Sequence, residues 1–256
     1  MVEGNQMIDK AQLEIETDLS VGDWIRESLA PRVPFSENPV TIGIVIPTGF
    51  ESYVLVHHTG PGDIHGGLGN ETLETLSEIL STFTSTPEVC FHALWEGQGW
   101  MHPGGTAVLT KVKYPKLHRF LHPIGIRIGR RRTIRIRRPN RNQVHSLGHL
   151  QSHTLPEGIM DATRFDLPNR GYLLMRGPLA EAKNIGWIFS ESFHTQSPNL
   201  LWPLDRQWIL ATEIDFNVTL IGGSEALISS ILNQGSLTTH RFEVTNTIAE
   251  LPVTEY

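Results

Sequence analysis

Short apolar runs separated by glycine- and proline-rich turns constrain the fold of this 256-residue chain more than any other feature. The β-branched run at 40–46 and the run at 52–58 flank a Pro-Thr-Gly turn, and a run at 208–215 is closely followed by another at 218–221. Runs of this length joined by turn residues are typical of antiparallel strands. The sequence therefore predicts a hairpin over 40–58 and a second pair of strands over 208–221.

Helical patterns are fewer and shorter than the strand patterns. Leucine and isoleucine side chains between 73 and 80 recur at helical spacing and predict a helix over 71–83. Ser224 is the expected N-cap of a helix over 225–232, and Ser20, with Asp23 three residues later, predicts a capped helix over 21–29. The remaining expected elements are strands over 89–95, 171–175 and 241–245 and a short helix over 178–183.

These elements define the expected fold class. Strands occur in neighbouring pairs rather than alternating with helices, which favours an α+β fold with a largely antiparallel sheet and few short helices. We expect a polar N-terminal tail over 1–18 and a single α+β domain over 19–256. A basic β-hairpin insertion interrupts this domain at about 106–156.

Charge is distributed very unevenly along the chain. The net charge is −6, yet the 60 residues 97–156 contain no Asp or Glu and twelve Lys or Arg. The other 196 residues carry nine bases against 27 acids. Segregation on this scale indicates an electrostatic partner, which is either another molecule or the acidic remainder of the chain.

The basic segment also has a strand-like pattern. Isoleucines at 124, 126 and 128, and again at 134 and 136, alternate with glycine, threonine or arginine. Side chains alternate between the two faces of a strand, so the pattern predicts a hairpin with an apolar underside and an arginine-rich upper face. The turn falls at 129–132. The expected anion-binding residues are Arg127, Arg130, Arg131, Arg132, Arg135, Arg137, Arg138 and Arg141.

An anionic partner, either nucleic acid or an acidic protein, would relieve the repulsion among these arginines. Arginine forks suit phosphate, and a basic two-stranded ribbon can enter a nucleic-acid groove. No aromatic residue lies between Phe120 and Phe165, which argues against recognition of RNA or single strands by stacking. Two alternatives stay open: a solvated basic loop, and a basic arm that docks on the acidic body or on a second copy.

Several classes of protein are disfavoured. The single cysteine, Cys90, excludes an internal disulfide framework and a cysteine-type zinc site. No apolar run is long enough to span a membrane, so we expect no membrane partner. The acidic, polar residues 1–18 do not resemble a secretory signal or a transit peptide. We therefore expect a cytoplasmic protein, and no motif indicates a cofactor.

Glu213 and Asp215 are the main catalytic candidates. At a spacing of two they share one strand face, where paired carboxylates can hold a metal or perform acid–base chemistry. Together with His57, His58 or His240 they would form a metal-dependent hydrolase, which is the alternative to a non-catalytic binding protein. The simpler interpretation is a solvent-facing polar face, with Arg206 as a possible neutralising partner.

Other motifs give weaker signals. His145, His149 and His153 are candidate metal ligands, because their spacing of four would place them on one face of a helix. Gly148 disfavours this helix, and no carboxylate is close in sequence to complete the site. His57, His58 and His65 surround a glycine-rich loop that contains Asp63. The Gly-Gly-Ser-Glu-Ala sequence at 222–226 is similar to a nucleophile elbow, but a helix cap explains its serine better.

Several blocks carry a resemblance to a known family. They are IPTGFESY at 46–53, ALWEGQGW at 93–100, RGYLLMRGP at 170–178, SPNLLWPLDRQW at 197–208, ATEID at 211–215 and IGGS at 221–224. Together they resemble a family of bacterial proteins, mainly actinobacterial, that has no assigned activity. The resemblance implies a cytoplasmic bacterial protein and supplies no catalytic residues. The basic segment does not match that family and is expected to be a lineage-specific insertion.

Overall fold

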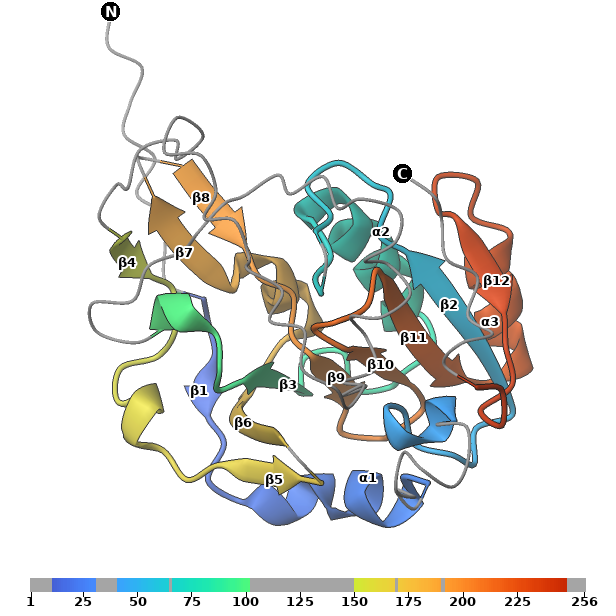
Figure 1. The fold of residues 1–256 in the computed structure, drawn as a ribbon, viewed down its shortest axis with the longest axis horizontal. Helices are drawn as coiled ribbons and strands as arrows, with labels where there is room; N and C mark the ends of the chain where they lie inside the picture. The colour runs from blue at the N-terminus through green and yellow to red at the C-terminus, as the bar shows by residue number, and fades with distance from the viewer. Residues whose placement is uncertain are drawn as a thin grey trace, which may run out of the picture.

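The fold is an open antiparallel β-sheet with helices packed on it, seen in a computed structural model (Figure 1). Residues 11–30, 41–64, 66–101, 150–168, 170–189 and 192–247 are described. The strands are β1 (Glu14–Ile15), β2 (Ser52–His57), β3 (Cys90–Trp95), β4 (Leu150–His153), β5 (Phe165–Leu167), β6 (Arg170–Gly177), β7 (Gly186–Phe189), β8 (Ser192–Thr195), β9 (Leu200–Pro203), β10 (Ile209–Thr212), β11 (Val218–Gly223) and β12 (Thr239–Arg241).

The helices are short, and the longest of those described, α2, has 12 residues. The α-helices are α1 (Asp23–Ser28), α2 (Asn70–Ser81) and α3 (Glu225–Leu232). The 3-10 helices are η1 (Leu19–Gly22), η2 (Ile42–Ile44), η3 (Gly99–Met101), η6 (Ile159–Asp161) and η7 (Leu179–Asn184). None of the described helices is long and apolar enough to cross a bilayer.

The main sheet has nine strands in the order β1-β6-β3-β9-β10-β11-β2-β12, with β5 also paired to β6. Every pairing in it is antiparallel, for example β3 with β6 and β11 with β2. A second sheet of three strands, in the order β4-β7-β8, lies beside it (Figure 1). The large antiparallel sheet and the few short helices confirm the expected α+β class.

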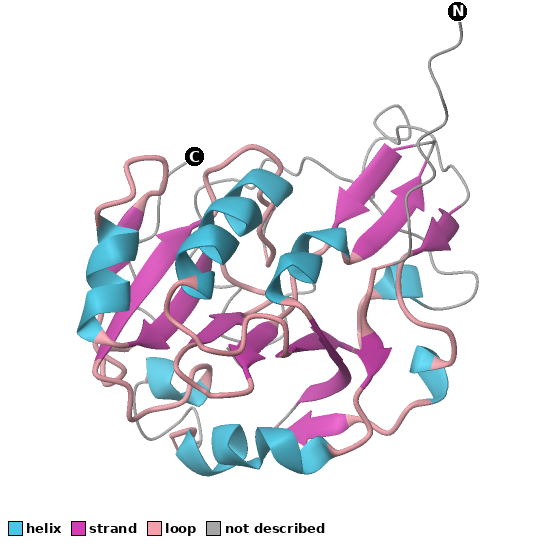
Figure 2. Ribbon diagram, turned by 180° about the vertical axis from the view of Figure 1, so that it is seen from behind, coloured by secondary structure: helices cyan, strands magenta, loops and turns pink. Residues whose placement is uncertain are grey.

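One face of the main sheet is covered by helices. Figure 2 shows α2, α3 and η7 together over this face. Leucines of α2, such as Leu76, and isoleucines of α3, such as Ile228, are buried against Val54 and Leu210 of the sheet and against Trp208, which directly precedes β10. The spacing of the apolar side chains on α2 therefore produced the helix that the sequence predicts, with a shift of one or two residues at its ends.

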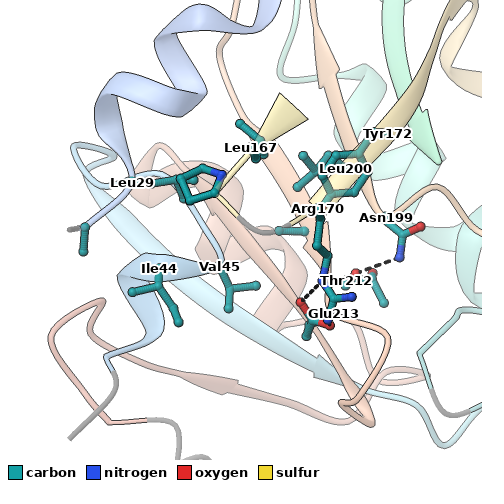
Figure 3. A pocket seen from close by; sticks show the side chains of 13 residues that line it. Leu29, Ile44, Val45, Leu167, Arg170, Tyr172, Asn199, Leu200, Thr212 and Glu213 are labelled. Carbon is teal, nitrogen blue, oxygen red and sulfur yellow. Dashed lines mark hydrogen bonds and ion pairs between the residues drawn. The ribbon is translucent and has the colours of Figure 1, made fainter. Parts of the chain in front are cut away.

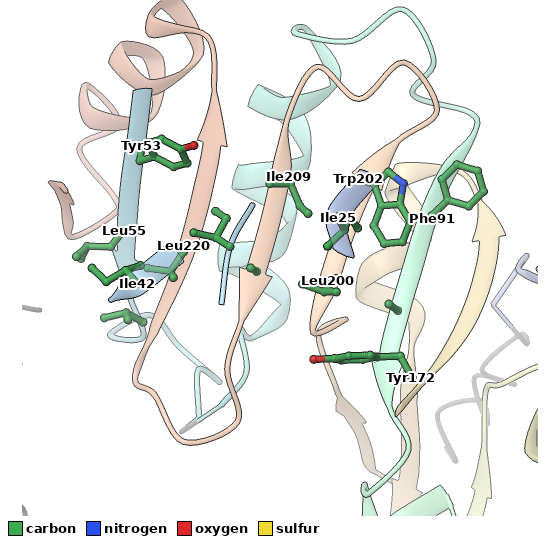
Figure 4. Close-up of a cluster of buried hydrophobic side chains, with 14 of the residues drawn as sticks. Ile25, Ile42, Tyr53, Leu55, Phe91, Tyr172, Leu200, Trp202, Ile209 and Leu220 are labelled. Carbon is green, nitrogen blue, oxygen red and sulfur yellow. The ribbon is translucent and has the colours of Figure 1, made fainter. Parts of the chain in front are cut away.

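The opposite face is covered by short, irregular segments. Ile25 of α1 and Ile42 of η2 pack on strand residues such as Leu55, Leu220 and Trp202 (Figure 4). Because both faces are covered, successive residues of the central strands are all buried, as along β10 and β11. This explains why the sequences of the central strands are continuous apolar runs and do not alternate between apolar and polar residues.

The strand expected at 40–46, and with it the hairpin over 40–58, is wrong. Its described part contains the 3-10 helix η2, and β2 pairs instead with β11 on one side and β12 on the other. Both edges of β2 are thus occupied, so no position beside it remains for another strand. The backbone N–H groups of Ile42 and Gly43 instead donate to the carbonyls of Asn246 and Val244.

Other boundaries also need correction. Ser20 is not the cap of the first helix: Asp18 caps η1 by accepting a hydrogen bond from the Ser20 N–H at 3.1 Å, and α1 begins only at Asp23. The last strand is β12 at Thr239–Arg241 rather than 241–245. Within the expected 1–18 tail, β1 pairs with β6 and Leu13 is buried, while 1–10 lie outside the described residues.

The expected basic hairpin over 124–136 and its arginines lie outside the described residues. The chain leaves the described body after Met101 of η3 and re-enters it at β4. Met101 and Leu155, near the two ends of this gap, are both buried in one cluster with Trp100 and Trp187. The expected insertion at about 106–156 stays a prediction; of its described part, Leu150–His153 form β4, which pairs with β7.

Candidate functional site

A cavity of about 250 Å³ lies on the irregularly covered face of the main sheet (Figure 3). Its walls come from the end of α1, from η2 and from strands β5, β6, β9 and β10. The apolar side chains that line it are Leu29, Ala30, Ile44, Val45, Leu167, Pro168, Leu200 and Ala211, and the polar ones are Arg170, Tyr172, Asn199, Thr212 and Glu213. Apolar walls with a few convergent polar groups are typical of small-molecule sites.

Glu213 is held in this cavity by Arg170. Arg170 donates from Nε to Glu213 Oε2 at 3.1 Å and from Nη2 to Glu213 Oε1, so the pair is bidentate. Asp215 Oδ2 is 3.7 Å from the same Nη2. The guanidinium also lies over the Trp95 ring at 5.3 Å. Stacking and a two-point carboxylate contact both favour arginine over lysine at this position.

The two candidate carboxylates do not share a strand face. β10 ends at Thr212, and Glu213 and Asp215 lie in the turn that leads to β11. The Glu213 side chain is 16% exposed whereas that of Asp215 is 64% exposed. The turn therefore places Glu213 in the lining of the cavity and leaves Asp215 largely exposed to solvent.

The partner that the sequence suggested for these carboxylates, Arg206, is elsewhere. Arg206 has a left-handed backbone with φ of 56° and lies over the Trp24 ring at 5.8 Å. Arg170 is 43 residues from Glu213 in sequence and reaches it because β6 and β10 belong to one sheet. Nothing in the local sequence indicates this pairing, although Arg170 does lie in a block of the resemblance described above.

Burial dominates the acid–base properties of the cavity. It raises the pKa of Glu213, against the opposing effect of Arg170. It also raises the pKa of Tyr172, and the neighbouring Glu213 charge adds to this shift. Asn199 is fixed in place, because its Oδ1 accepts a hydrogen bond from the backbone N–H of Trp95 at 2.9 Å and its Nδ2 donates to the Thr212 carbonyl at 3.1 Å.

The candidate histidines have other partners. His57 Nε2 and His240 Nδ1 are 3.1 Å apart, and burial followed by the His240 charge lowers the pKa of His57. His58 makes contacts of 2.8 Å with the Ile64 carbonyl and with Thr219 Oγ1. Within the described ranges, no group of three or more His, Cys, Asp or Glu is arranged to hold a metal ion.

The remaining candidate ligands are divided between described and undescribed residues. His153 is on β4, where its ring centroid is 6.3 Å from that of Trp100. His65, His145 and His149 lie outside the described residues. The interpretation of Ser224 as a helix cap is confirmed, because its Oγ accepts from the Leu227 N–H at 3.2 Å.

Comparisons with known proteins add no relative: no protein-family model, no curated protein and no solved structure matches this chain. The resemblance to the actinobacterial family thus stays a prediction.

Proposed function

We propose that this chain is a non-catalytic binding protein whose basic segment contacts an anionic partner, either nucleic acid or an acidic protein. One observation carries the proposal: the 48 residues 102–149 contain twelve Lys or Arg and no Asp or Glu. Arginine pairs with phosphates and carboxylates by two parallel hydrogen bonds, so such a segment is suited to a polyanion. The binding residues are Arg127, Arg130, Arg131, Arg132, Arg135, Arg137, Arg138 and Arg141.

The charge of the described residues supports an assignment of polyanion binding to the basic segment and not to the rest of the chain. Its residues include 21 Asp or Glu but only seven Lys or Arg. Five of those seven form ion pairs with carboxylates within the described ranges: Arg26, Arg164, Arg170, Lys183 and Arg241. The body therefore offers little free positive charge to a polyanion, and the basic segment would have to supply it.

The alternative, a metal-dependent hydrolase built on Glu213 and Asp215, has less support. A metal bound at Glu213 would have to displace a bidentate arginine. His57 and His240 contact each other, His58 contacts Ile64 and Thr219, and none of these histidines lines the cavity that contains Glu213. The proposal accordingly includes no catalytic residue and no cofactor.

Fluorescence anisotropy tests the proposal with labelled random duplex DNA, RNA and polyglutamate as probes, each at low and physiological salt. We expect at least one probe to bind, with an affinity that falls steeply as salt rises because bound counterions are released. An Arg130→Ala, Arg131→Ala, Arg132→Ala variant should bind more weakly and show a shallower salt dependence.

A second triple variant serves as the matched control. Lys111→Ala, Lys113→Ala and Lys116→Ala remove the same charge from the same segment but spare the arginines. An equal loss in both variants would mean that charge alone matters and would overturn the assignment to the arginine hairpin. Absence of binding to all three probes at low salt would overturn the proposal and favour docking on the acidic body or on a second copy.

A further inference from the structure

The cavity beside Arg170 is lined by a mostly buried tyrosine whose hydroxyl remains accessible. Tyr172 is only 7% exposed and lines the cavity, and its hydroxyl makes no hydrogen bond to any described residue. This hydroxyl is not among the fully buried polar atoms of the described residues that lack a partner, so it is accessible to water or to a ligand that enters the cavity. A ligand in the cavity that hydrogen-bonds to Tyr172 Oη would take the place of such a water.

The charges around the cavity favour a cationic ligand. Two carboxylates, Glu213 and Asp215, lie within ion-pair distance of a single guanidinium, that of Arg170. When both are ionised, this group of three side chains has a net charge of about −1. Arg170 already uses Nε and Nη2 on Glu213, so an incoming anion would have to compete with an existing bidentate pair.

The size and walls of the cavity limit the rest of the ligand. Its volume of about 250 Å³ is smaller than that of most drug-binding pockets. The side opposite Arg170 is apolar and includes Leu29 and Val45 (Figure 3). This shape accommodates one ring or a short alkyl chain with a single polar head.

We propose that this cavity binds a small primary amine that carries an apolar ring or chain. The ammonium group donates hydrogen bonds to Tyr172 Oη and to the Glu213 carboxylate, which keeps its contact with Arg170. The apolar part packs against Leu29, Val45 and Leu200. This site is independent of the basic segment and of the polyanion partner proposed for it.

Isothermal titration calorimetry with three probes of equal shape tests the proposal. Benzylamine, benzyl alcohol and benzoate share one ring and differ in the charge of the head. We expect benzylamine to bind more tightly than benzoate by at least about tenfold, which corresponds to about 1.4 kcal/mol. Benzoate binding as tightly as benzylamine, or no binding of any probe at millimolar concentration, would overturn the proposal.

Variants of the polar residues that line the cavity distinguish the contribution of the ligand's charged head from that of its ring. Tyr172→Phe and Glu213→Gln should each weaken benzylamine by about tenfold, the scale of one hydrogen bond to a charged group. In Glu213→Gln, the preference for benzylamine over benzoate should fall, because Arg170 loses its carboxylate partner Glu213 and its guanidinium can then bind the benzoate carboxylate. Val45→Trp should block all three probes by filling the cavity. The control is Glu225→Gln on α3, which removes a carboxylate that does not line the cavity and should change nothing.

A measurement on the unaltered protein keeps the test decisive if a variant fails to fold. Nuclear Overhauser effects between the benzylamine ring and the methyl groups of Leu29 and Val45 should be seen at saturating probe. Contacts to methyl groups elsewhere, with none to these two residues, would place the amine outside the cavity and overturn the proposal.

Discussion

The two faces of the main sheet are covered in different ways. On one face, α2 and α3 place regular apolar stripes against the strands, with Trp208 fully buried and its Nε1 donating to the Leu80 carbonyl at 3.1 Å. On the other, α1 and η2 cover the strands in short pieces and leave the cavity with its Arg170–Glu213 pair. The helical face thus serves stability, and the irregular face leaves room for a ligand.

The largest effect is expected on the helical face. Trp208→Ala should lower the free energy of unfolding by about 3–5 kcal/mol, because it leaves a large void between α2 and the sheet. Leu29→Ala at the cavity should cost only about 1 kcal/mol, since Leu29 is partly exposed and lines a space that is already open. Urea unfolding monitored by circular dichroism measures both, and equal losses would contradict the contrast between the faces.

The helical face should also make the protein sensitive to acid through His92. This residue of β3 is fully buried, and burial lowers its pKa to about 4. Between pH 6.5 and 4 the unfolded chain binds a proton at this histidine that the folded chain does not, so the folded state loses stability as the pH falls through this range. The loss is on the order of 3 kcal/mol for a shift of this size.

Urea midpoints measured across pH 4–7 test the role of His92. A His92→Leu variant, which cannot take up the proton, should show a flatter dependence on pH than the unaltered protein. It should also be less stable near pH 7, because the contact of His92 Nε2 with the Pro178 carbonyl at 3.2 Å is lost. The same pH dependence in both proteins would show that other groups cause it.

On the irregular face the expected effects are smaller. Arg170→Met should cost about 1–3 kcal/mol, because it leaves the mostly buried Glu213 carboxylate without its partner. The matched control is Arg164→Met, whose partner Glu96 is 45% exposed and can be solvated by water; its cost should be lower. If the two variants lose equal stability in urea, Arg170 has no special role at the cavity.

The helical face is also the part of the fold that the sequence predicts best. Helix α3 and its Ser224 cap follow from local spacing and cap chemistry, and α2 follows from its apolar stripe. The irregular face depends on contacts between distant segments. Residues 41–46 have the composition of a strand, but both neighbours of β2 are supplied by the last third of the chain, so they form η2 instead.

The site was predictable only in part for the same reason. The spacing of Glu213 to Asp215 marks it as a candidate, and it does line a cavity. Its partner Arg170 and the neighbouring Tyr172 come from β6, which the sheet order places three strands from β10. Sequence spacing carries no information about such an approach, so the local pattern suggested Arg206, the nearest arginine in sequence.

The smallest effect is expected at the exposed rim of the helical face, where Arg241 of β12 pairs with Glu225 of α3. Hydrogen bonds from Arg241, Ser229 and Ser52 lower the pKa of Glu225 to about 2, so the pair favours folding above the ordinary carboxyl pKa and this contribution is lost as the pH falls toward 2. Both groups are solvent-exposed, and salt screens such pairs.

A carbon-13 NMR titration should therefore find a depressed pKa for Glu225 that rises with added salt. The Glu225→Gln variant should leave the urea midpoint nearly unchanged. A large loss of stability in Glu225→Gln would contradict this expectation. The attachment of α3 to the sheet would then depend on the ion pair as well as on the buried leucine and isoleucine side chains.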